Sequence, residues 1–156
     1  MKRRDPWAKK IYAWEGTWPD WNREQMTLPQ CRELIRLACQ AYGLPPPAVR
    51  QYKGNTAYSY CHPEGSYIAF IAAHKNKAIA VHEAAHYIHD RTYGMQTEPD
   101  HGWKWQGIYF WLLSKCGMAP LVALKASARA HGLRWHVIRP SRYHVQARRA
   151  LSAGAK

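Results

Sequence analysis

Apolar residues recur at helical spacing along several stretches of the chain, most clearly over residues 77–90. There Val81, Ala85 and Ile88 stand at i, i+4 and i+7, so one stripe of a helix can pack into a core. The polar side chains of the same stretch fall on a neighbouring stripe, where a cleft can form. We therefore predict an amphipathic helix over 77–90 that presents polar side chains to a site.

Three further helices are predicted from the same spacing and from signals at their ends. Thr27 and Gln30 have the spacing of a capping box, which starts a helix that ends at Gly43. Two more are expected over residues 103–116 and 120–130, each followed closely by a glycine.

Between residues 49 and 71 the pattern changes to that of strands. Residues 57–61 and 66–71 flank a turn and predict a β-hairpin, and another short strand is expected over 133–138. We expect an α+β domain in which a short antiparallel sheet packs against the 77–90 helix and the further helices.

The length of 156 residues suits a single domain. We divide the chain into an aromatic and basic N-terminal segment (1–26), one domain (27–138) and a basic C-terminal tail (139–156). We expect the N-terminal segment to be loosely ordered, with aromatic rings that fill gaps over the core. No apolar run approaches the roughly 18 residues of a membrane span, and the basic N-terminus lacks the apolar stretch of a secretory signal. A cytoplasmic setting is expected. The four scattered cysteines predict buried free thiols rather than disulfides or a zinc ribbon.

The formal net charge of +13 is unevenly distributed. After Asp100 the chain carries ten lysines and arginines and no acidic residue. Such asymmetry is typical of a polyanion-binding protein, with nucleic acid the first candidate, and an anionic membrane surface or an acidic protein also fits. A basic face that only keeps the protein soluble is the alternative. Aromatic residues interleave with the arginines, which predicts salt-sensitive DNA binding through Arg134, Arg139, Arg142, Arg148 and Arg149.

The run His82-Glu83-Ala84-Ala85-His86 lies within the 77–90 helix. Residues four apart share a helix face, with Cβ atoms roughly 5–6 Å apart, so His82 and His86 can bind one Zn²⁺. Glu83 can then face a water on the metal and act as its general base. A catalytic zinc site has three protein ligands and one open position, so the motif predicts a zinc peptidase if a third ligand is present.

Three residues compete to be that third ligand. His89 lies one turn past His86, but a third ligand on the same straight helix closes a tetrahedron poorly. Glu98 stands in a loop, where a glutamate is more often just solvated. His101 follows a loop long enough to return to the metal, and it starts the next helix. We therefore favour His101.

Two supporting roles stay open in the sequence. One is a carboxylate that orients a ligand histidine, for which the candidates are Asp90, Glu98 and Asp100, although a carboxylate in such a position is more often just solvated. The other is a donor that stabilises the oxyanion, for which the candidates are Tyr93, His131 and His136.

Together with the downstream run His101-Gly102-Trp103-Lys104-Trp105, the motif resembles the SprT-like (Spartan-type) zinc metalloproteases, whose pattern is H-E-x-x-H followed by H-G-x-x-aromatic. The resemblance covers roughly residues 28–116. It implies a small zincin-like domain that acts on proteins attached to DNA. By the same resemblance, Glu83 is the catalytic residue, and the three zinc ligands are His82, His86 and His101. The chain departs from the family in having no cysteine zinc ribbon after the core.

Two alternatives remain open. Residues 80–89 also resemble the ImmA/IrrE regulatory peptidases, but those proteins need a downstream glutamate ligand, and no glutamate follows Glu98. The other alternative is a nucleic-acid-binding or structural protein whose zinc site is closed by a fourth ligand and is not catalytic. The intact Glu83 argues against it, because a purely structural site does not need that carboxylate.

Overall fold

The computed structural model describes residues 5–53, 59–62, 67–95, 99–136, 138–140 and 153. Over these ranges the chain forms five α-helices, one short 3₁₀ helix and three strands. In chain order they are α1 (Ala8–Glu15), η1 (Pro19–Asn22), α2 (Leu28–Ala41), β1 (Ala48–Tyr52), β2 (Tyr60–Cys61), β3 (Tyr67–Ile71), α3 (Lys77–Tyr93), α4 (Trp103–Lys115) and α5 (Leu121–Ala130). The predicted α+β class is confirmed.

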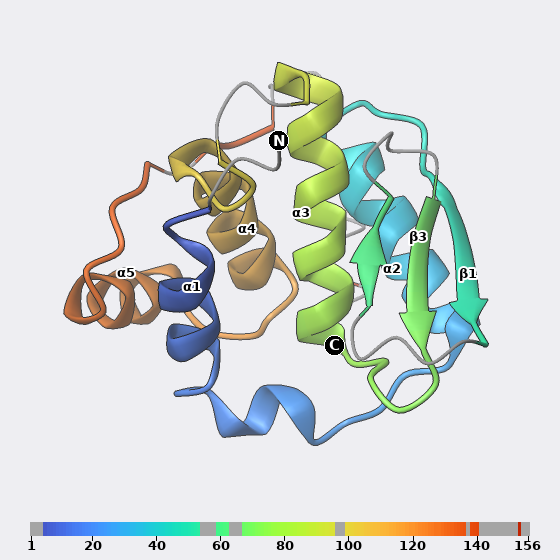
Figure 1. Ribbon diagram of the computed structural model, residues 1–156, viewed down its shortest axis with the longest axis horizontal. Helices are drawn as coiled ribbons and strands as arrows, with labels where there is room; N and C mark the ends of the chain where they lie inside the picture. The colour runs from blue at the N-terminus through green and yellow to red at the C-terminus, as the bar shows by residue number, and fades with distance from the viewer. Residues whose placement is uncertain are drawn as a thin grey trace.

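Helix α3 runs through the middle of the molecule (Figure 1). The sheet and α2 lie on one side of it, and α1 and α4 lie on the other, with α5 beyond them. Val81, Ala85 and Ile88 are fully buried, as the spacing predicted. Because α3 is covered from both sides, polar side chains of its middle turns, such as His82 and Glu83, are held inside the protein rather than on a free surface.

Side-chain caps fix where α2 and α3 begin. The predicted capping box is present: Thr27 Oγ1 accepts from the backbone N–H of Gln30 at 3.3 Å, and the Thr27 N–H donates to Gln30 Oε1 at 2.7 Å. At the start of α3, the Asn76 side chain accepts from the N–H of Ile79 at 2.9 Å. Asn76 Nδ2 also donates to Asn22 Oδ1 at 3.0 Å, which ties η1 to the first turn of α3.

The sheet is mixed, with strand order β1-β3-β2. Strands β2 and β3 pair antiparallel, with Cys61 opposite Ile68, as the hairpin predicted. Strand β1 pairs parallel with β3, with Val49 also opposite Ile68, so the prediction of an entirely antiparallel sheet is wrong. A hairpin joins neighbouring segments and can be predicted from the turn between them. The pairing of β1 with β3 joins more distant segments, and no sequence pattern in either strand predicts its direction. As a result, β2 is an edge strand, and it packs beside α3.

The N-terminal segment is more ordered than the sequence suggested. We expected a loosely ordered start, but residues 8–15 form α1 and residues 19–22 form η1. Ile11 and Trp14 are fully buried, and the Trp14 ring lies 4.7 Å from that of Phe110. The Trp14 indole N–H donates to Ser127 Oγ at 3.0 Å. Trp14 and Trp21 therefore complete the core, as expected, and Trp14 anchors α1 against α4 and α5.

The strand expected over 133–138 is not formed by the described residues of that stretch. This segment instead runs along α4, where the Ile138 N–H donates to the Gly107 carbonyl at 3.3 Å. A Cβ on Gly107 would collide with the His136 carbonyl oxygen, so the close approach requires glycine at this position. Because this N–H bonds to a helix carbonyl and not to a strand, the segment does not become part of a sheet.

The structure confirms the expected state of the cysteines, whereas the predicted basic tail stays largely untested. Cys31, Cys39 and Cys116 are buried free thiols and Cys61 is a partly buried one. Within the described ranges, no helix combines the length and apolar character that a membrane crossing needs. Of the basic tail predicted over 139–156, most residues lie outside the described part of the chain.

Candidate metal centre

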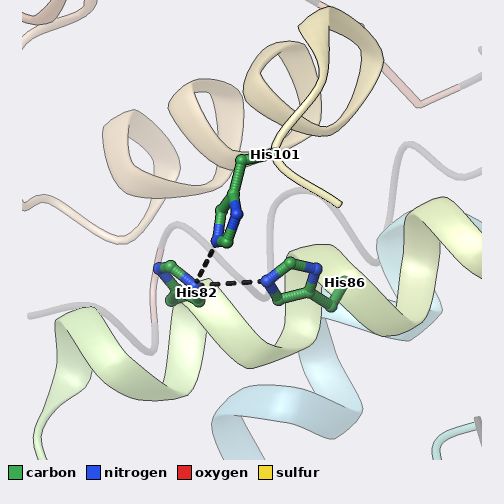
Figure 2. A group of neighbouring side chains, drawn as sticks. All are labelled: His82, His86 and His101. Carbon is green, nitrogen blue, oxygen red and sulfur yellow. Dashed lines mark hydrogen bonds between the residues drawn. The ribbon is translucent and has the colours of Figure 1, made fainter. Parts of the chain in front are cut away.

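Three imidazoles converge between α3 and α4. His82 and His86 project from successive turns of α3, and His101 reaches them from the turn before α4 (Figure 2). The Nε2 atom of His82 lies 3.2 Å from Nε2 of His86 and 3.2 Å from Nε2 of His101. The ligand atoms of all three lie within 4.8 Å of one another. The structure thus brings together the three histidines that the sequence selected.

The position of His101 is set by the start of α4. The Gly102 N–H donates to the Pro99 carbonyl at 2.8 Å, which closes the turn. The Gln106 side chain, one turn into α4, donates to the His101 carbonyl at 2.8 Å. The Trp105 ring is fully buried and lies 4.8, 4.9 and 4.6 Å from the rings of the three histidines, so it forms the inner wall of the site.

Carboxylates from the N-terminal segment hold two of the imidazoles. His82 Nδ1 donates to Glu15 Oε1 at 2.7 Å, and His101 Nδ1 donates to Asp5 Oδ2. The Tyr109 hydroxyl donates to the same Glu15 oxygen at 2.7 Å. An ionised carboxylate only accepts hydrogen bonds, so the ring proton of each histidine is on Nδ1. A carboxylate on the far nitrogen of an imidazole is the usual support of a metal ligand.

This tautomer makes the centre fit a cation. When both rings are neutral, with their protons on Nδ1, the Nε2 atoms of His82 and His101 present bare lone pairs to each other at 3.2 Å. Two acceptors facing each other repel unless a positive ion lies between them. In a tetrahedral site with bonds of roughly 2.0–2.1 Å, ligand nitrogens stand roughly 3.3–3.4 Å apart, close to the separation seen here. The three histidines can therefore hold one metal ion.

Burial and the facing charges shift the pKa values of these groups in different directions. Burial would lower the pKa of His82, but the charge and hydrogen bond of Glu15 outweigh it and raise that pKa. Burial alone would raise the pKa of Asp5 and of Glu15, but hydrogen bonds and positive charge from the facing histidines outweigh it, so both pKa values lie below their ordinary values. The pKa of His86 falls well below its usual value, because the ring is buried and faces His82 and His101. A ligand imidazole must be neutral, so this shift favours metal binding at His86.

Glu83 lies on α3 next to His82 and is only 7% exposed. Burial raises its pKa above the ordinary value, although the nearby His82 and a hydrogen bond from the Cys61 backbone act in the opposite direction. Since Cys61 belongs to β2, the carboxylate lies between the metal centre and the edge strand. A carboxylate of raised basicity beside a metal centre has the properties of a general base.

Tyr12 of α1 covers the histidines from the solvent side. Its ring lies 6.1 Å from that of His82 in a stacked arrangement and 5.5 Å from that of His101, edge to face. Tyr12 is 55% exposed, in contrast to the buried Trp105 opposite it. Partial burial and the surrounding carboxylates raise the pKa of Tyr12 to about 12, so its hydroxyl keeps its proton at neutral pH.

Several residues considered in the sequence lie elsewhere. His89 is buried but does not join the three converging ligand atoms, and its Nδ1 donates to Asp90 at 3.0 Å. Asp90 is thus engaged by His89 rather than by a ligand, and Asp100 is exposed. Neither makes a hydrogen bond to one of the three histidines among the described residues, so neither of these candidates takes the orienting role. Glu98 lies outside the described residues.

The suggested oxyanion donors also have other neighbours. His131 Nδ1 donates to the Ser127 carbonyl at 2.9 Å. The His136 ring lies 6.2 Å from that of Trp103. Tyr93 lies against His89, at 5.6 Å between ring centroids. Among the described contacts, none of the three candidates touches the metal centre.

Sequence reasoning missed Asp5, Tyr12 and Glu15. The predicted supporting carboxylates all follow the motif in the chain, whereas these three residues precede it by 67 residues or more. No local pattern connects them to the histidines. The only available signal was that the N-terminal segment carries acidic residues among its basic and aromatic ones.

Comparison of the chain with models of protein families, with curated proteins and with solved structures gives no significant match.

Proposed function

We propose that this chain is a zinc-dependent metalloendopeptidase in which His82, His86 and His101 hold the metal and Glu83 is the general base. The observation that carries the proposal is the combination of three converging imidazoles with a buried carboxylate on the adjacent helix position. Imidazole nitrogen is a donor that Zn²⁺ prefers, and three such donors leave a fourth position for a substrate or water. The zincin-like fold and membership of the SprT-like proteases belong to the same proposal and rest on the motif spacing.

When bound in this centre, Zn²⁺ polarises a peptide carbonyl and lowers the pKa of water from about 15.7 towards 7. Glu83 takes the proton of the attacking water and passes it to the leaving amine. Asp5 and Glu15 keep the two ligand imidazoles in the required tautomer and orientation. Tyr12 replaces the earlier candidates as the donor to the oxyanion, since its protonated hydroxyl is on the ring that lies over two of the ligands.

Strand β2 provides a means of holding an extended peptide. It is one of the two edge strands of the sheet, and the Cys61 backbone contacts Glu83. A peptide that adds to a sheet edge is bound through its main chain, which allows a peptidase to accept varied sequences. This arrangement supports proteins or peptides as the substrate class.

The non-catalytic alternative requires a fourth protein ligand. Among the described residues, no cysteine and no fourth histidine joins the three converging ligand atoms, and His89 is engaged with Asp90. A closed structural site would also leave Glu83 buried without a role. We therefore favour the open, catalytic site.

Glu83→Gln provides the direct test of the enzyme. It keeps the size of the side chain and all three histidines, so the variant should bind zinc normally while peptide cleavage falls by at least about 10²–10⁴-fold. Glu24→Gln changes an exposed glutamate and serves as the matched control. Cleavage of an unfolded protein substrate and zinc content would be measured for all three proteins. Equal cleavage by Glu83→Gln and the parent would remove Glu83 from the mechanism.

A second feature favours contact with nucleic acid. A cavity of about 760 Å³ beside α5 is lined by basic side chains around an aromatic ring, namely Lys125, Arg129, Arg134, Arg139 and Trp135. The Lys125 ammonium lies 5.7 Å from the Trp135 ring. Basic side chains bind phosphates, and a ring can stack on an unpaired base. Arg142, Arg148 and Arg149, predicted to add to this surface, lie outside the described residues.

We propose that this basic surface brings the peptidase to proteins attached to DNA. Affinity for single- and double-stranded DNA should fall steeply as salt increases, and neutralising Arg129, Arg134 and Arg139 should reduce both the affinity and its salt dependence. Arg36→Gln, on the exposed face of α2, is the control. Absence of DNA binding at low salt would leave a peptidase without a DNA-directed role.

A further inference from the structure

A cavity of about 270 Å³ opens beside His82, between α1, η1 and the first turns of α3. Its volume is just below the roughly 300–1,000 Å³ of pockets for drug-sized ligands, which suits one side chain rather than a cofactor. Because it adjoins a metal ligand, a side chain inside it would belong to a residue close to the bond being cleaved.

Glu15 lines this cavity with a carboxylate that can accept further hydrogen bonds. Both of its described hydrogen bonds, from His82 and from Tyr109, are made to Oε1. Among the described residues, none donates to Oε2. The side chain is 23% exposed, so the carboxylate is accessible from the cavity while one of its oxygens stays fixed.

The remaining walls are apolar or aromatic. Ala78 and Ile79 contribute aliphatic surface from α3, and Tyr12 and Trp21 contribute rings from α1 and η1. An aliphatic stem can pack against such walls, and a cation at its end is attracted both by ring faces and by a carboxylate. A purely apolar side chain would cover the open oxygen of Glu15 without giving it a partner, which is unfavourable.

The charge around the metal centre also favours a cationic side chain in the cavity. The chain as a whole carries a formal charge of +13, yet three of its ten acidic residues, Asp5, Glu15 and Glu83, gather at the histidines. One divalent cation does not fully compensate three carboxylates. The mouth of the centre is therefore more acidic than the rest of the protein, and an acidic substrate residue would be repelled there.

We propose that this cavity, which we call the α1/α3 cavity, is a specificity subsite that receives a lysine or arginine side chain of the substrate, with the cationic end at Glu15. The inference rests on the proposed peptidase function and names its substrate class: polypeptide segments rich in basic residues. Such segments are abundant in proteins that bind DNA, because lysine and arginine neutralise phosphates.

The test compares two peptides that differ only in one charge, with arginine or its neutral isostere citrulline at a single position. Binding is measured with the zinc-loaded Glu83→Gln protein, and cleavage is measured with the zinc-loaded parent. We expect the arginine peptide to bind and to be cleaved at least about tenfold better, which corresponds to about 1.4 kcal/mol. Placing the arginine at successive positions along the peptide identifies the residue that enters the cavity.

A cavity-filling variant locates the effect. Ala78→Leu should abolish the preference for arginine, while Ala126→Leu, the same change at an exposed position of α5, should keep it. Zinc content and circular dichroism show whether each variant is folded. If Ala78→Leu does not fold, NMR of the Glu83→Gln complex gives the same information, since the arginine side chain should show contacts with the rings of Tyr12 and Trp21.

The outcomes separate this inference from the proposed function. Arginine-selective binding without any cleavage by the parent would support the subsite and contradict the peptidase. Cleavage without a preference for arginine over citrulline would support the peptidase and overturn the subsite. If the peptides neither bind nor are cleaved, both proposals fail.

Discussion

Helix α3 and the turn before α4 supply the three imidazoles, whereas the N-terminal segment around α1 supplies the groups that hold them. The two regions depend on different interactions. His82 and His86 share a face because α3 is a helix, and His101 is fixed by bonds within the turn before α4. Asp5 and Glu15 reach the ligands only because buried Ile11 and Trp14 hold α1 against the rest of the protein. The spacing of His82 and His86 is therefore set within one helix, whereas the orientation of the ligand rings depends on contacts between distant segments.

The largest effect should follow from removing a ligand. His101→Ala leaves two imidazoles, which cannot hold zinc as a three-ligand centre, so zinc affinity should fall by more than the roughly 100-fold expected for losing a supporting group, and peptide cleavage should be lost with it. His89→Ala is the matched control, because His89 is a buried histidine of α3 outside the centre. Zinc titration against a competing chelator measures both. Full zinc occupancy in His101→Ala would mean that another residue is the third ligand.

Tyr12→Phe tests whether α1 takes part in the reaction itself. Removing the hydroxyl keeps the ring over His82 and His101, so zinc affinity should not change, while kcat should fall by about 10²-fold if the hydroxyl stabilises the oxyanion. Tyr52→Phe, at another exposed tyrosine, is the control. An unchanged kcat in Tyr12→Phe would restrict α1 to orienting the ligands.

The smallest effects should come from the supporting carboxylates. Glu15→Gln and Asp5→Asn weaken the bonds to His82 and His101 without removing a ligand, so zinc affinity should fall by about 10–100-fold in each. Glu24→Gln and Asp20→Asn make the same changes on exposed side chains and should leave zinc affinity unchanged. Equal affinities in all four variants would mean that the N-terminal segment only covers the centre.

The same division explains what the sequence could predict. The stripe of α3, the capping box of α2 and the spacing of His82 and His86 each depend on residues within one or two helical turns, and all three are found as expected. The parallel pairing of β1 and the contacts of Asp5 and Glu15 join segments far apart in the chain. Such contacts depend on how the whole core packs, and no periodicity in either partner records them. His101 lay between these cases, because its loop length allowed a return to α3 but did not require one.

The coordination sphere of the bound metal tests the central claim most directly. X-ray absorption of the zinc-loaded protein should show three imidazole nitrogens and one light oxygen ligand at roughly 2.0–2.1 Å, which is the signature of an open tetrahedral site. A fourth imidazole, or a sulfur at about 2.3 Å, would show a closed structural site and contradict the peptidase.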